Sequence, residues 1–104
     1  MMLSEYFVET FKRYLRKHGI RILAIAKLTG QKKVKIGLKG LYRYYVEYSP
    51  NYPKLEQLVK AIISSEKEKS LLDKIGLKLV RMNDEPYIEL SVNRLEELIR
   101  ETET

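Results

Sequence analysis

The spacing of apolar residues changes once along this chain, close to Gly76. Before that point, apolar side chains recur at steps of three and four, which is the period of amphipathic helices. After it, residues 77–82 and 87–92 are short apolar, β-branched stretches on either side of the turn-rich sequence 83–86. A chain of 104 residues has room for one compact core. The sequence therefore predicts a mainly α fold, with about five helices followed by a short β-hairpin and a C-terminal helix.

Capping residues and glycines predict where the first helices begin and end. Ser4 can cap a helix over residues 5–18, and Gly19 can end that helix because glycine tolerates the left-handed conformation. A short second helix is predicted over residues 21–29, where apolar residues again follow helical spacing up to Gly30.

The later helices carry similar signals. A helix over residues 53–63 is predicted, with a proline in its first turn. Ser65 and Glu68 have the spacing of a capping box and predict the start of a fifth helix. Asn93 and Glu96 repeat this spacing before the last apolar stretch and predict the start of the C-terminal helix.

Residues 34–48 are predicted to form an amphipathic helix with two different faces. Apolar residues at steps of four and three would form its buried face: Val34, Leu38, Leu41, Tyr45 and Tyr48. A second, basic face would carry Lys35, Lys39, Tyr42 and Arg43. Gly37 and Gly40 oppose this helix by about 1 kcal/mol each, so its ordered part could begin near Leu38.

Positive charge is concentrated in one third of the chain. The segment from Thr10 to Val46 contains eleven Lys and Arg residues and no Asp or Glu, whereas the flanking parts carry net charges of −2 and −3. Such segregation creates a local positive potential that attracts phosphate backbones. The alternative is that these cations are only the solvated faces of ordinary amphipathic helices. Nucleic acid is the partner that the charge pattern favours.

Two short sequences resemble a known family. Residues 25–30 read Ile-Ala-Lys-Leu-Thr-Gly, in which the small Ala26 permits close helix crossing and the final glycine permits a sharp turn. Residues 51–62 contain the pattern Asn-x-Pro-x-Leu-x-x-Leu. Over roughly residues 20–75 the chain resembles the helix-turn-helix DNA-binding proteins of the phage-repressor-like (lambda repressor-like) regulators. It departs from them at residues 31–35, which look like an insertion after the turn.

This resemblance implies binding to duplex DNA, as a transcriptional regulator or a DNA accessory factor. The helix over residues 34–48 would then enter the major groove, where the guanidinium of Arg43 could pair with a guanine edge. Lys32 and Lys33, at the turn, would contact phosphates, and basic residues of the first helix would extend the phosphate track. The predicted DNA-binding residues are Lys32, Lys33, Lys35, Lys39, Tyr42, Arg43, Arg13, Arg16, Lys17 and Arg21. The composition, rich in charged residues and without Cys or Trp, resembles that of thermophile proteins, as in an archaeon, its virus or its plasmid.

The sequence suggests a division at Gly76. Residues 1–76 would form the DNA-binding domain, and residues 77–104 a hairpin and helix that could form a homodimer. The alternative is that this second part only covers the same core. A winged-helix arrangement, with the hairpin against the DNA, is disfavoured because Asp84 and Glu85 at its tip would repel phosphate.

Two other functions remain open. Crowded tyrosines beside basic residues could stack on bases and hold RNA or single strands; they are Tyr42, Tyr44, Tyr45, Tyr48 and Tyr52. Core packing is the simpler explanation for Tyr45 and Tyr48. The third function is a protein-interaction module in which the basic region has no nucleic-acid partner.

Several functional classes are not expected. The chain has no cysteine and one histidine, His18, so the sequence predicts no disulfide, no zinc site and no cofactor. We expect no enzymatic activity, since a tyrosine nucleophile acting on DNA would need several more groups around the phosphate. His18 is explained by its place at a predicted helix end. With no long apolar stretch, neither a signal peptide nor a membrane span is expected, and the predicted location is the cytoplasm.

Overall fold

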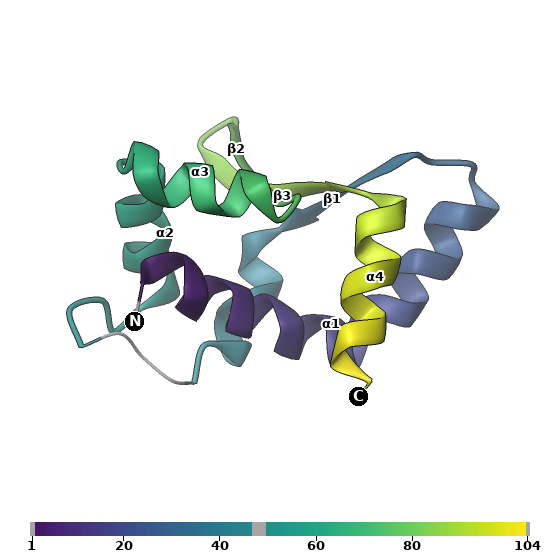
Figure 1. Ribbon diagram of the computed structural model, residues 1–104, viewed down its shortest axis with the longest axis horizontal. Coiled ribbons are helices and arrows are strands. Elements are labelled where there is room, and N and C mark those ends of the chain that lie inside the picture. Colours follow the sequence, from purple (N-terminus) through teal and green to yellow (C-terminus); the bar gives the residue numbers. More distant parts are fainter. Residues whose placement is uncertain (1, 47–49, 104) are drawn as a thin grey trace.

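The computed structural model describes residues 2–46 and 50–103 (Figure 1). The prediction of a mainly α fold with a short hairpin and a C-terminal helix is confirmed. In chain order the elements are α1 (Leu3–Leu28), β1 (Lys33–Gly37), the 3₁₀-helix η1 (Leu38–Tyr44), α2 (Leu55–Ile63), α3 (Glu66–Lys74), β2 (Lys78–Met82), β3 (Glu85–Ser91) and α4 (Val92–Thr102).

The three strands form one antiparallel sheet in the order β1-β3-β2. Its register places Val34 opposite Leu90 and Ile36 opposite Ile88, and all four side chains are buried. The lysines that alternate with them on β1 therefore point to the outer face. Because β1 precedes Gly76 and β3 follows it, the two parts suggested by the sequence share one sheet.

The first two predicted helices are one continuous helix, α1, so the predicted break after residue 18 is wrong. Gly19 is buried in the interior of α1, where a hypothetical Cβ would lie 2.8 Å from Cγ1 of Ile99 on α4. Glycine is needed here for a close helix contact and not for a turn. The predicted cap is also wrong, since α1 starts at Leu3 and Ser4 lies inside it.

The predicted helix over residues 34–48 is not formed. Its first residues are strand β1 and the following ones are η1. The two glycines weaken a helix here, and alternation of Val34 and Ile36 suits a strand that can pair with β3. Four of the five side chains predicted as buried are buried, on β1, η1 and the residue after η1, while Tyr48 lies outside the described residues.

The later elements agree more closely with the sequence. α2 ends where predicted but starts at Leu55, so Pro53 precedes the helix and is not in its first turn as predicted. α3 follows Ser65 as predicted, and the hydroxyl of Ser65 accepts a hydrogen bond from the backbone N–H of Glu68 at 3.2 Å. The hairpin turn consists of Asn83 and Asp84, both with positive φ, as the tightest hairpin turns require. α4 is capped by Ser91 instead of Asn93.

The core lies between the helices and the inner face of the sheet. α1 contacts α2, α3 and η1, and α4 packs against the C-terminal half of α1 (Figure 1). The apolar residues of the segment 77–104 that a dimer contact could use are buried within this chain: Ile88, Leu90, Val92, Leu95, Leu98 and Ile99. A homodimer through residues 77–104 would have to use the outer surfaces of these elements. Their apolar side chains cover the core of the same chain, which was the alternative to a dimer contact.

Candidate nucleic-acid interface

Folding neutralises part of the basic segment. Four of its lysines form ion pairs with glutamates that follow the hairpin turn, at N···O distances of 2.9–3.6 Å. The pairs are Lys12 with Glu101, Lys27 with Glu96, Lys33 with Glu89 and Lys39 with Glu85. The hydrogen bond from Lys27, and then its charge, lower the pKa of the Glu96 carboxyl. The acidic tail thus pairs with four of the eleven cations of this segment, although Lys27, Lys33 and Lys39 stay more than half exposed.

The cations outside these four pairs lie on α1, β1 and η1 and in the turn between α1 and β1. Six exposed cations of the segment form no ion pair within the described part of the chain: Arg16, Lys17, Arg21, Lys32, Lys35 and Arg43. Arg13, Lys17 and Arg21 follow one another at steps of four and form a stripe about 12 Å long on α1. We call Arg13, Arg16, Lys17, Arg21 and Arg43 the α1–η1 basic face.

A cluster of rings fixes η1 on α1. The Nε2 atom of His18 and the hydroxyl of Tyr44 are hydrogen-bonded at 2.8 Å, and the ring of Tyr14 packs edge-on against Tyr44 with centroids 5.8 Å apart. A guanidinium nitrogen of Arg13 donates to the carbonyl oxygen of Tyr44 at 3.4 Å. Arg43, the residue before Tyr44, is therefore held close to the stripe on α1. His18 lies within α1, so its predicted place at a helix end is wrong.

Burial of this cluster also affects its ionisation. Burial raises the pKa of the Tyr14 phenol, and the neighbouring Tyr44 adds to the increase, whereas the charge of Arg21 opposes it. The protonated phenol is consequently the form that the fold favours. The cluster provides a rigid connection between the basic stripe and η1.

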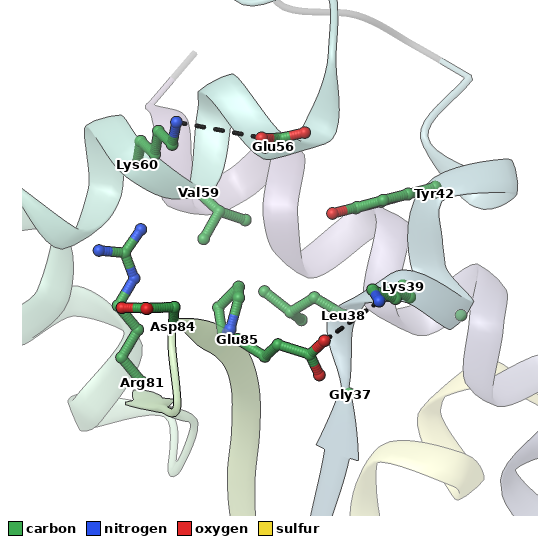
Figure 2. A pocket seen from close by; sticks show the side chains of 12 residues that line it. Gly37, Leu38, Lys39, Tyr42, Glu56, Val59, Lys60, Arg81, Asp84 and Glu85 are labelled. Carbon is green, nitrogen blue, oxygen red and sulfur yellow. Dashed lines mark hydrogen bonds and ion pairs between the residues drawn. The ribbon is translucent and has the colours of Figure 1, made fainter.

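The remaining predicted residues are elsewhere. Lys33 and Lys35 project from the outer face of the sheet, where the Lys35 ammonium lies 5.5 Å from the centre of the Tyr87 ring. Lys32 precedes them in the turn. Lys39 and Tyr42 line a cleft between η1, α2 and the hairpin (Figure 2). The ten predicted residues are thus distributed over three surfaces. Five of them lie together on the α1–η1 basic face, and the other surfaces hold fewer.

The described tyrosines among those expected to hold single strands do not share one exposed face, and Tyr48 lies outside the described residues. Tyr45 is 3% exposed, and its hydroxyl donates to the carbonyl oxygen of Tyr52 at 2.6 Å. Tyr44 belongs to the ring cluster on α1, and Tyr42 is exposed at the cleft. The core-packing explanation is therefore correct for Tyr45.

A pair of helices joined by a tight turn is formed by α2 and α3, whereas the helix-turn-helix was expected from the helices predicted at residues 21–29 and 34–48. Ser64 and Ser65 connect α2 to α3, and the β2–β3 hairpin follows directly (Figure 1). The outward side chains of α3 include Lys67 and Lys74, balanced by Glu66 and Asp73. The sequence contains the helix signals for this pair, whereas the basic segment lies in the preceding residues.

No group of three or more His, Asp or Glu side chains in residues 2–46 and 50–103 is placed to hold a metal ion. Within the same residues, no helix is long and apolar enough to cross a membrane. Comparison with protein-family models, curated proteins and solved structures finds no match to this chain.

Proposed function

We propose that this protein binds duplex DNA, as a transcriptional regulator or DNA accessory factor, without catalysing a reaction. The observation that carries the proposal is the α1–η1 basic face. Four of its cations, Arg16, Lys17, Arg21 and Arg43, are exposed and form no ion pair within the described residues, whereas neighbouring lysines are paired with the acidic tail. Exposed cations at regular spacing favour phosphate contacts, which supply most of the affinity for DNA. The proposed location is the cytoplasm, where the duplex DNA of a prokaryotic cell lies.

The order α2, turn, α3, hairpin supports a winged form of the helix-turn-helix. In a helix-turn-helix the second helix enters the major groove, so base contacts are assigned to α3, with Lys67, Ser70 and Lys74 exposed on it. Arg43, previously expected to read a base, is assigned to phosphate because it lies on η1. Asp84 at the hairpin tip forms no ion pair within the described residues, so we assign no phosphate contact to that tip.

The test compares two variants with the same loss of charge. The first replaces Arg16, Lys17 and Arg21 by glutamine, and the control replaces three paired lysines: Lys12, Lys27 and Lys39. Affinity for a labelled duplex is measured by fluorescence anisotropy over a salt series. Each lost phosphate contact lowers the slope of log affinity against log salt by about 0.9, so the first variant should lose up to about 2.7 and the control much less. Equal losses would show that net charge, and not this face, governs binding.

Sequence readout is tested separately on α3. Replacing Lys67 and Ser70 by alanine should reduce the preference for a selected site over random duplex, whereas the triple glutamine variant should weaken both alike. A selected site that is bound equally well by the α3 variant would contradict the assignment of base contacts to α3.

A second candidate function is supported by the outer face of the sheet. There Lys35 lies over the ring of Tyr87, with Lys33 and Lys78 on the adjoining strands. An aromatic ring among lysines suits stacking of unpaired bases, so this face favours RNA or single-stranded nucleic acid. Single-stranded DNA and RNA in the same salt series distinguish the two functions. Tighter binding of single strands, lost on Tyr87→Ala, would favour this second function.

A further inference from the structure

A cleft of about 610 Å³ opens between η1, α2 and the tip of the hairpin (Figure 2). Its apolar lining includes Leu38, Val59 and Pro86, and Tyr42 forms one wall with its hydroxyl directed toward the space. Tyr42 is 44% exposed, which is high for a large ring beside an apolar surface. Clefts of this size commonly hold small molecules that combine an apolar body with a few polar groups.

The charges around the cleft are balanced. Lys39 is paired with Glu85 at 3.1 Å, and Lys60 lies 3.9 Å from Glu56, which is at the limit of an ion pair. The two remaining charged groups are Arg81 and Asp84, and neither forms an ion pair or hydrogen bond within the part of the chain that the structure describes. An anion alone would meet three carboxylates, and a cation alone would meet three basic groups. A molecule with one charge of each sign avoids both penalties.

We propose that this cleft binds a small zwitterion with an aromatic or branched apolar body, such as a free α-amino acid or a dipeptide. Its carboxylate would pair with Arg81, which extends toward Lys60 on α2 (Figure 2). Its ammonium group would pair with Asp84, and its apolar body would lie against Pro86 and the exposed ring of Tyr42. A guanidinium is well suited to a carboxylate because it donates two parallel hydrogen bonds. The proposal is independent of DNA binding, because it rests on the lining of the cleft alone.

The probes differ only in charge. L-phenylalanine and glycyl-L-phenylalanine carry both charges, 3-phenylpropionate carries only the negative one, and phenylethylamine only the positive one. Binding is followed by amide chemical shifts in NMR titrations of the full chain. We expect at least one zwitterion to bind about tenfold more tightly than either singly charged probe, with shifts confined to residues of the cleft. Comparison of the two zwitterions distinguishes a free amino acid from a dipeptide.

Matched variants test the two assigned charges. Arg81→Gln and Asp84→Asn should each weaken zwitterion binding about tenfold, and asparagine suits the positive φ at position 84. Lys78→Gln is the control, because Lys78 is exposed on the same strand as Arg81 but does not line the cleft. Far-UV circular dichroism and Tm verify that each variant folds. Absence of shifts with both zwitterions at millimolar concentration, equal binding of the singly charged probes, or equal effects of Arg81→Gln and Lys78→Gln would overturn the proposal.

Discussion

Gly19 provides the sharpest test of the contact between α1 and α4. In an exposed helix, replacement of glycine by alanine stabilises a protein by about 1 kcal/mol. At Gly19 the new Cβ would lie 2.8 Å from Cγ1 and 3.0 Å from Cδ1 of Ile99. Carbon atoms prefer separations of about 3.5–4.0 Å, so the two helices would have to separate by roughly 0.7 Å or Ile99 would have to leave its rotamer. Overpacking of this kind costs about 1–3 kcal/mol.

The two effects partly cancel. Subtracting about 1 kcal/mol of helix propensity from an overpacking cost of about 1–3 kcal/mol leaves a net destabilisation of about 0–2 kcal/mol for Gly19→Ala. For a domain of this size, each kcal/mol changes Tm by about 4–8 °C. Urea unfolding, followed by circular dichroism, measures the difference. Ala24→Gly, at an exposed position of the same helix, serves as the control for propensity and should cost about 1 kcal/mol.

A double-mutant cycle with Ile99→Ala isolates the contact. Ile99→Ala alone should cost about 2–5 kcal/mol, but less when Gly19→Ala is also present, because the new methyl group then occupies vacated space. The reasoning is refuted if Gly19→Ala stabilises the protein by as much as Ala24→Gly destabilises it and its effect adds simply to that of Ile99→Ala.

Three further predictions concern single side chains. Glu68 is buried, and its carboxylate accepts a 2.8 Å hydrogen bond from the backbone N–H of Ser4. Glu68→Ala should therefore lower the free energy of unfolding in urea by roughly 1.5–3 kcal/mol. Glu68→Gln should lower it less, because the amide oxygen can still accept the hydrogen bond. The raised pKa of Tyr14 contributes stability that is present below its ordinary value of 10.0 and is lost as the pH rises through the pKa of the folded protein. Because phenylalanine does not titrate, Tyr14→Phe should flatten the decline of the urea midpoint at alkaline pH. The lowered pKa of Glu96 contributes stability that is present above its ordinary value of 4.5 and is lost as pH falls through the folded value. Accordingly, the difference between wild type and Lys27→Gln should be largest near neutral pH and diminish in acid; a difference that is independent of pH would contradict the pairing.

The sequence predicted the position of an element correctly where the capping or turn residues lay within a few positions of that element. The Ser65 and Glu68 pair marked the start of α3, and the turn-rich residues 83–86 marked the hairpin. These signals act through bonds between residues a few positions apart, so they do not depend on the remainder of the fold.

The first half of the chain was harder to predict because its glycines have tertiary roles. Gly19 reads as a helix stop in isolation, but in the structure it allows α4 to approach α1. Val34 and Ile36 fit a helix or a strand, and pairing with β3, more than fifty residues later, makes this segment a strand. The prediction of a recognition helix at residues 34–48 depended on reading Gly19 as a helix stop and on reading Val34 and Ile36 as helical.

The candidate site shows the same distinction. The concentration of cations between Thr10 and Val46 is visible in the amino-acid sequence, since it depends only on composition along the chain. Which of those cations form ion pairs depends on where Glu89, Glu96 and other acids of the tail are placed by the sheet and by α4. The cleft likewise exists only because the hairpin tip lies beside η1 and α2.

The sequence by itself determined that this protein is mainly helical, ends in a hairpin and a helix, and carries its positive charge in one segment, because periodicity, capping and charge are properties of neighbouring residues. Only the tertiary structure decided that α1 is unbroken and that residues 33–37 form an edge strand. It also decided that Arg16, Lys17, Arg21 and Arg43 are exposed without an ion pair in the part of the chain that the structure describes. Those outcomes depend on contacts between residues far apart in the chain, where packing and ion pairing outweigh local propensities of about 1 kcal/mol.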